Sequence, residues 1–124
     1  MDLLVTTFEA WPQVKQSLRV YRNSLADAGN WVGFRFPRRA GGPSPLGARV
    51  ALHCRGLTVI QHLTTGNGFR SGSANTVHFG LAAKDHVDRV EIRWPDGREL
   101  TLREPALNRY HDIQSGPPEG SAPP

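Results

Sequence analysis

Histidines are the residues of this sequence best suited to metal binding or acid–base chemistry. Outward-facing histidines on a half-solvated sheet are commoner than metal ligands, and no H-E-x-x-H or Cys/His spacing typical of zinc occurs. We therefore favour surface histidines over a zinc site, although three of them lie in segments that could form neighbouring strands: His53, His62 and His78. The remaining two are His86 and His111.

Other combinations that could support catalysis are equally weak. The serines Ser71 and Ser73 have no G-x-S-x-G frame. The carboxylates show no spacing that indicates a general acid and base; they include Asp85, Asp88, Asp96 and Asp112. We predict no catalytic residues and a non-enzymatic domain.

A glycine-rich stretch, TGNGFRSGSAN at residues 65–75, supplies the candidate ligand-binding residues Phe69, Arg70 and Asn75. Its backbone N–H groups could face an anion, but it lacks a G-K-[ST] ending and a following helix, which favours a hairpin connection. Aromatic residues could also stack on a sugar ring. The candidates are Trp31, Trp94, Phe69 and Tyr110, of which Phe69 is expected to be the most exposed.

The elements that must position these residues are extended segments separated by Gly, Pro and Asn. Nine segments fit: DLLVTTF, LRVYRN, NWVGFRF, GARVALHC, LTVIQHLTT, TVHFGL, DRVEIRW, ELTLRE and NRYHDI. No stretch keeps a helical apolar stripe for three turns. The pattern predicts an all-β protein, with a small antiparallel β-sandwich or barrel-like domain at residues 30–113, after a seam near residues 24–29.

The stretch VDRVEIRWPDG gives the clearest local prediction. Alternation places Val90, Ile92 and Trp94 on one core face. Pro95 and Asp96 suit the next turn positions, and Gly97 supplies a positive φ, so a hairpin should lead into ELTLRE.

Composition limits the function further. The 124-residue chain has a net charge of +4 and a pI near 10.0, but its arginines are scattered and mostly alternate with acids, so we predict no nucleic-acid partner. No apolar run could span a membrane. Cys54 is the single cysteine and is expected to be a buried free thiol. Residues 114–124 are rich in proline and are expected to form a disordered tail.

Several of these segments together resemble the ASPIC/UnbV family. GNWVGFRF, GARVAL, TGNGFRSGSANTVHFGL, VDRVEIRWPDG and NRYHDI follow that family's pattern in order and spacing, over about Asn30 to Ile113. The sequence departs from the pattern in having AGGPSP before GARV, FGLA in place of FGLG, and Gln61-His62 in place of an Arg-Glu pair. The resemblance implies a domain that follows an FG-GAP or VCBS-type β-propeller in a secreted protein.

Residues 1–23 resemble the end of such a propeller repeat. There, a calcium loop of the form D-x-D-x-D-G-x-x-D-L leads into a strand, and a second strand ends in Tyr-Arg-Asn. Asp2 and Leu3 match the end of the loop, and Tyr21 to Asn23 match the second strand. The resemblance therefore implies that Asp2 is the last ligand of a truncated calcium loop, that no complete metal site lies in this chain, and that the chain belongs to a longer propeller protein, whose full length could bind calcium.

Two hypotheses follow. In the first, the chain is a two-strand remnant of a propeller blade followed by a non-enzymatic accessory module, without a cofactor of its own. This module would contribute to protein or glycan binding outside the cell, in the periplasm or at the cell surface, with the upstream propeller as its intramolecular partner. In the second, suggested by the family's association with enediyne biosynthesis, it assists a biosynthetic enzyme or carries an unrecognised activity.

Overall fold

The computed structural model describes residues 3–24, 29–38, 44–66 and 72–114, and its regular elements there are all strands. The predicted all-β class is therefore confirmed. Candidate residues Asp2, Phe69 and Arg70, and the proline-rich tail from residue 115, lie outside the described residues. The strands are β1 (Leu3–Glu9), β2 (Lys15–Tyr21), β3 (Asn30–Arg35), β4 (Arg49–Cys54), β5 (Leu57–His62), β6 (Thr76–Ala82), β7 (Arg89–Arg93), β8 (Glu99–Arg103) and β9 (Tyr110–Asp112).

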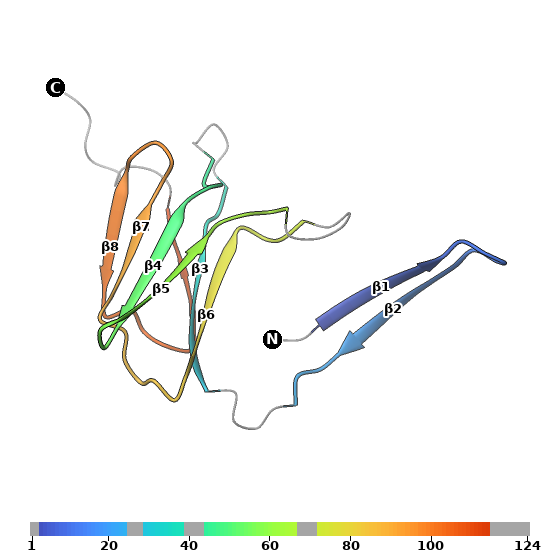
Figure 1. Cartoon of the computed structure of the whole chain (residues 1–124), viewed down its shortest axis with the longest axis horizontal. Coiled ribbons are helices and arrows are strands. Elements are labelled where there is room, and N and C mark those ends of the chain that lie inside the picture. The colour runs from blue at the N-terminus through green and yellow to red at the C-terminus, as the bar shows by residue number, and fades with distance from the viewer. Residues whose placement is uncertain (1–2, 25–28, 39–43, 67–71, 115–124) are drawn as a thin grey trace.

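Seven of these strands form a β-sandwich (Figure 1). One sheet has the order β6-β3-β9 and the other the order β5-β4-β7-β8. Alternation along each strand sends one set of side chains between the sheets, where they form a single core. The fully buried members include Val32, Phe34, Phe36, Val50, Leu52, Leu63, Val90 and Ile92.

Most neighbouring strands are antiparallel, as predicted, but β3 and β9 run parallel. Gly33 lies opposite Tyr110 in this pair, and Arg35 lies opposite Asp112. The backbone bonds continue beyond the strand, since Ile113 N donates to Arg35 O over 2.7 Å. This pairing encloses β3 between two neighbours and brings residues near the end of the chain beside the first strand of the sandwich.

The β7–β8 hairpin forms as its residues predict. Trp94 is 5 % exposed and belongs to the core, together with Val90 and Ile92. Gly97 has a φ of 88°, and its N–H donates to Trp94 O over 3.0 Å. The turn is closed by Trp94 N, which donates to Arg98 O over 2.9 Å. Trp94 is thus a core residue and no part of an exposed aromatic platform.

The β4–β5 hairpin turns through two residues with positive φ, Arg55 at 47° and Gly56 at 78°. Such a pair of conformations matches the right-handed twist of the flanking strands. Arg55 is held there by Asp88, whose Oδ2 accepts from the backbone N–H of Arg55 over 2.8 Å. Just before the turn, the thiol of Cys54 is buried and donates to His86 O over 3.0 Å, which confirms the predicted buried free cysteine.

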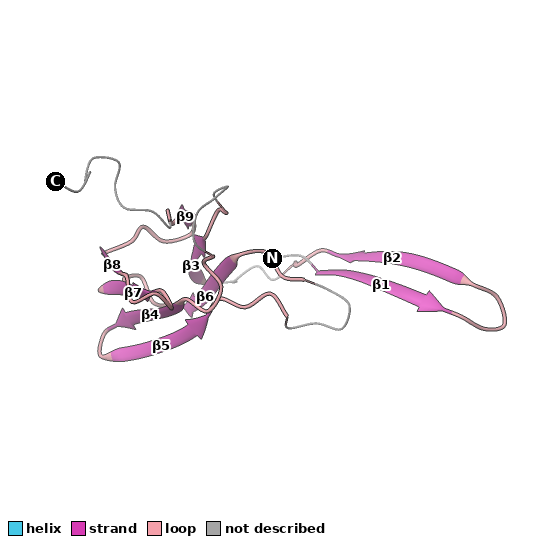
Figure 2. Cartoon of the chain, turned by 90° about the horizontal axis from the view of Figure 1, so that it is seen from above, coloured by secondary structure: helices cyan, strands magenta, loops and turns pink. Residues whose placement is uncertain are grey.

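Strands β1 and β2 form a separate two-stranded sheet that pairs with no strand of the sandwich (Figure 2). Their register runs from the Leu3–Tyr21 pair to the Glu9–Lys15 pair. Large apolar side chains of this hairpin are exposed, among them Phe8 at 64 % and Trp11 at 86 %. The hairpin therefore carries apolar surface on a sheet whose two edges are both open.

Candidate functional site

A cluster of aromatic rings covers the outer face of the three-stranded sheet. Because Val32 and Phe34 of β3 point into the core, their neighbours Trp31, Gly33 and Arg35 lie on the opposite face. The same alternation places His78 and Gly80 of β6 and Tyr110 of β9 on that face. We call this set of six residues the aromatic face.

Gly33 lets the rings of the aromatic face meet. A Cβ at this position would lie 2.3 Å from two ring carbons of Tyr110, so the Tyr110 ring lies directly over the glycine. The ring centroid of Tyr110 is 4.9 Å from that of Trp31 and 6.0 Å from that of His78. A side chain at position 33 would displace Tyr110 and separate the three rings.

Trp31 and His78 stack on each other, with ring centroids 5.0 Å apart and an interplanar angle of 25°. The Tyr110 hydroxyl lies 3.4 Å from His78 Nδ1. Arg35 completes the cluster, because its guanidinium carbon lies 4.4 Å above the centre of the Tyr110 ring. The face therefore combines half-buried rings with an exposed cation.

An asparagine pair fixes the start of β3, and with it the position of Trp31. Asn108 Oδ1 accepts from Trp31 N over 3.1 Å, and Asn108 N donates to Trp31 O over 2.6 Å. Asn108 Nδ2 donates to Asn30 Oδ1 over 2.9 Å. These hydrogen bonds connect the segment before β9 to β3, and they therefore fix the position of Trp31 relative to Tyr110.

Partial burial lowers the pKa of His78 below its ordinary value of 6.5. The imidazole is therefore mostly neutral at neutral pH, which suits stacking against Trp31. A neutral ring also keeps the centre of the aromatic face apolar.

One position beside Trp31 is open. Gly80 lies opposite Trp31 in the β3–β6 register, it is exposed, and a Cβ built on it meets no atom within 4 Å. The surface over Gly80 therefore forms a shallow depression beside the rings of the aromatic face. A flat group placed there could contact Trp31 without displacing any part of the protein.

The structure brings together only part of the predicted platform. Trp31 and Tyr110 meet, Trp94 lies in the core, and Phe69 falls outside the described residues. Asn75 lies just before β6, and its backbone carbonyl accepts from Phe36 N over 2.8 Å.

From the sequence, His78 was a candidate only for metal binding or acid–base chemistry, and Gly33, Arg35 and Gly80 were not selected. The alternation within NWVGFRF places Gly33 and Arg35 beside Trp31 and could have selected them. Gly80 could not be selected in this way, because its position opposite Trp31 depends on the strand register.

The histidines do not converge. His53 and His62 are both on the four-stranded sheet, whereas His78 is on the other sheet. Within the ranges that the structure describes, no three His, Cys, Asp or Glu side chains are placed to hold a metal. In the same ranges, no helix is long and apolar enough to cross a membrane.

Comparison with known proteins identifies the family. The family described as ASPIC and UnbV matches residues 39–120, which is more than half of the chain. The chain belongs to this family. The matched range contains His78 and Tyr110, whereas Trp31 precedes it.

Cartilage acidic protein 1 of three vertebrates is similar to this chain. The Homo sapiens protein is 30% identical over 102 residues, and the Mus musculus protein is 29% identical over 102 residues. Each of these matches covers 82% of this chain and 15% of the relative. The Xenopus tropicalis protein is 28% identical over 116 residues, which cover 91% of this chain and 17% of the relative. The chain thus spans only a small part of the relatives that it matches.

Proposed function

We propose that this chain is a non-enzymatic accessory module of a longer secreted protein, in which it follows a β-propeller and contributes to protein or glycan binding through the aromatic face. The observation that carries the proposal is the open position at Gly80 beside the half-buried ring of Trp31. Sugar rings and apolar protein side chains both bind to such surfaces through stacking on an indole.

A secreted setting is supported by the relatives, whose printed name places them with cartilage. Their much greater length supports a longer protein around this domain.

The β1–β2 hairpin supports an upstream β-propeller as the intramolecular partner. An isolated two-stranded hairpin is at best marginally stable, and open edges accept further strands. Exposed Leu4, Phe8 and Leu18 add an apolar surface that another sheet would bury. A propeller blade that includes this hairpin would supply both the missing strands and the missing cover.

Three of the described histidines support a non-enzymatic role, because their ring nitrogens make local contacts. His86 Nε2 lies 3.2 Å from Asp88 Oδ1, and His53 Nε2 lies 3.1 Å from Glu91 Oε2. His111 Nε2 lies 2.9 Å from Ala106 O, and its ring stacks on Phe34 in the sandwich. His53 Nδ1 also lies 3.0 Å from the hydroxyl of Thr58, a contact to which we assign a structural role.

A glycan array tests the binding role with the substitution Gly80→Val. The backbone of Gly80 is not in the left-handed region, and the added side chain meets open space, so the variant should fold like the parent while filling the low surface beside Trp31. We expect the parent to bind a subset of glycans and Gly80→Val to lose at least about ten-fold of that affinity. Unchanged binding by Gly80→Val would place recognition away from the aromatic face.

A further inference from the structure

The outer face of the four-stranded sheet carries an excess of positive charge. Its outward positions on β4, β7 and β8 include four arginines and two glutamates, which leaves two positive charges uncompensated. We call this surface the arginine face; its charged members are Arg49, Arg89, Arg93, Arg103, Glu91 and Glu99.

The arginines lie directly opposite one another. Arg49 of β4 is the register partner of Arg93 of β7, and Arg89 of β7 is the register partner of Arg103 of β8. Like charges at directly opposed positions of a sheet destabilise the pair. An anion between the two guanidinium groups of a pair would turn this repulsion into attraction.

The two glutamates compensate only part of this charge. Arg89 Nε donates to Glu91 Oε1 over 2.7 Å, and Arg93 Nε lies 3.6 Å from Glu99 Oε1. Among the described residues, no carboxylate lies within 4.0 Å of Arg49 or Arg103. Each opposed pair thus contains one arginine that is free to bind an anion.

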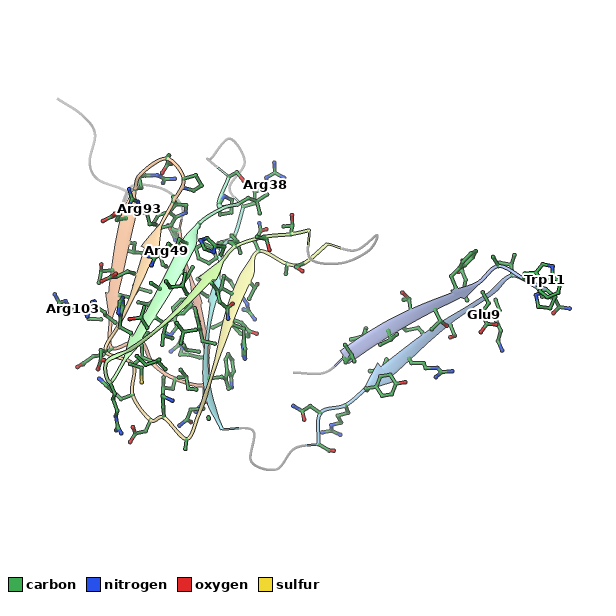
Figure 3. The ribbon with its side chains drawn as sticks, in the orientation of Figure 1. Glu9, Trp11, Arg38, Arg49, Arg93 and Arg103 are labelled. Carbon is green, nitrogen blue, oxygen red and sulfur yellow. The ribbon has the colours of Figure 1, made fainter. Side chains whose placement is uncertain are left out.

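The geometry suits a ligand with separated negative groups. The two opposed pairs are four residues apart along β7, which corresponds to about 13 Å. A hollow of about 330 Å³ lies beside the first pair. Its polar lining consists of Arg49, Arg93 and Thr101 together with Glu91 and Glu99, the two glutamates that pair with Arg89 and Arg93. Figure 3 shows the labelled side chains of Arg49, Arg93 and Arg103 on this sheet.

We propose that the arginine face binds an acidic polysaccharide whose sulfate or carboxylate groups engage the two opposed arginine pairs. Planar guanidinium groups donate two hydrogen bonds at once to such oxygens. The ligand is a polysaccharide rather than a nucleic acid, because single strands need aromatic platforms for their bases. The described outward positions of this sheet hold no Phe, Tyr or Trp.

Titration with a heparin dodecasaccharide, and in parallel with a hyaluronan oligosaccharide of equal length, tests the proposal. Heparin offers sulfate and carboxylate groups and hyaluronan offers only carboxylates, so the two titrations distinguish which group binds. We expect saturable binding of at least one, weakened by added salt. The double variant Arg49→Gln/Arg103→Gln should bind about ten-fold more weakly.

Matched controls make the test specific. Arg19→Gln/Arg22→Gln removes the same charge from exposed positions in and just after β2, and it should leave the affinity for the oligosaccharide unchanged. Gly80→Val, on the opposite sheet, should also leave this affinity unchanged. The Arg49/Arg103 variant should melt no lower than the parent, because it relieves like-charge repulsion. Equal losses in both arginine variants, absence of saturable binding by the parent, or tighter binding of a DNA duplex would each overturn the proposal.

Discussion

Gly33 decides whether the aromatic face exists, because only a residue without a side chain allows the Tyr110 ring to lie over β3. Sequence reasoning could select Trp31 and Tyr110 as aromatic candidates, since both residue types stack on ligands. It could not show that His78 stacks on Trp31 or that Tyr110 lies over Gly33, because these contacts depend on the register of three strands that are distant in sequence.

His78 should make stability depend on pH. Its pKa is lowered in the folded chain by partial burial, so the unfolded chain binds more protons around and below pH 6.5. The free energy of unfolding should therefore fall as the pH decreases from about 7 to about 5, and His78→Gln should reduce that fall. Denaturant titrations at several pH values measure the effect.

Two carboxylates with lowered pKa values titrate below this pH window. Hydrogen bonds from Arg89 and His53 lower the pKa of Glu91 below 4.5, and hydrogen bonds from Arg98 lower the pKa of Asp96 below 3.8. Any stability that these groups contribute is lost only as the pH falls below those values.

His62→Gln, at the exposed end of β5, is the matched control for His78→Gln. Parallel curves for the parent and His78→Gln would refute the assignment.

At the scale of the elements, local turns were predictable and long-range pairings were not. The Pro95-Asp96-Gly97 turn follows from the φ preferences of adjacent residues, and the structure confirms it. The parallel pairing of β3 with β9 joins segments at opposite ends of the sandwich sequence. No local pattern encodes that pairing, because either strand has the same alternation in a parallel or an antiparallel sheet.

Gly97→Val tests the turn. The backbone φ of 88° is strained for a β-branched residue, so the variant should lose about 1 to 3 kcal/mol of unfolding free energy. Gly80→Val is the matched control, since the same side chain enters open space in β6. Chemical denaturation compares the two. If Gly97→Val unfolded at the parent's midpoint, the positive φ of Gly97 would not govern the stability of this turn.

At the scale of the whole molecule, the two sheets of the sandwich present different chemistry to solvent. The aromatic face is built from rings around Gly33 and Gly80, whereas the arginine face is built from opposed charges on β4, β7 and β8. The net charge of +4 did not predict this division, because composition cannot show which arginines share a surface. Strand register shows it, since register determines which side chains stand opposite one another.

Calcium binding is expected to need more of the propeller loop than this sequence contains. On the propeller-repeat interpretation, Asp2 would be the last ligand in D-x-D-x-D-G-x-x-D-L, and this sequence holds only the final Asp and Leu of that pattern. Calcium takes about six to eight oxygen ligands, so one carboxylate cannot form a site. Calorimetric titration should therefore detect only weak, non-saturating binding to the 124-residue chain.

A protein extended upstream to include the whole loop should bind calcium specifically, because the converging acidic side chains then complete the coordination shell. The same extension should bury the exposed apolar residues of the β1–β2 hairpin, since a complete blade supplies strands for its open edges. Slower amide hydrogen exchange in β1 and β2 of the extended protein would report that pairing. Saturable, tight calcium binding by the 124-residue chain itself would instead show that a complete site lies within these residues, and the propeller-loop interpretation of Asp2 would then be wrong.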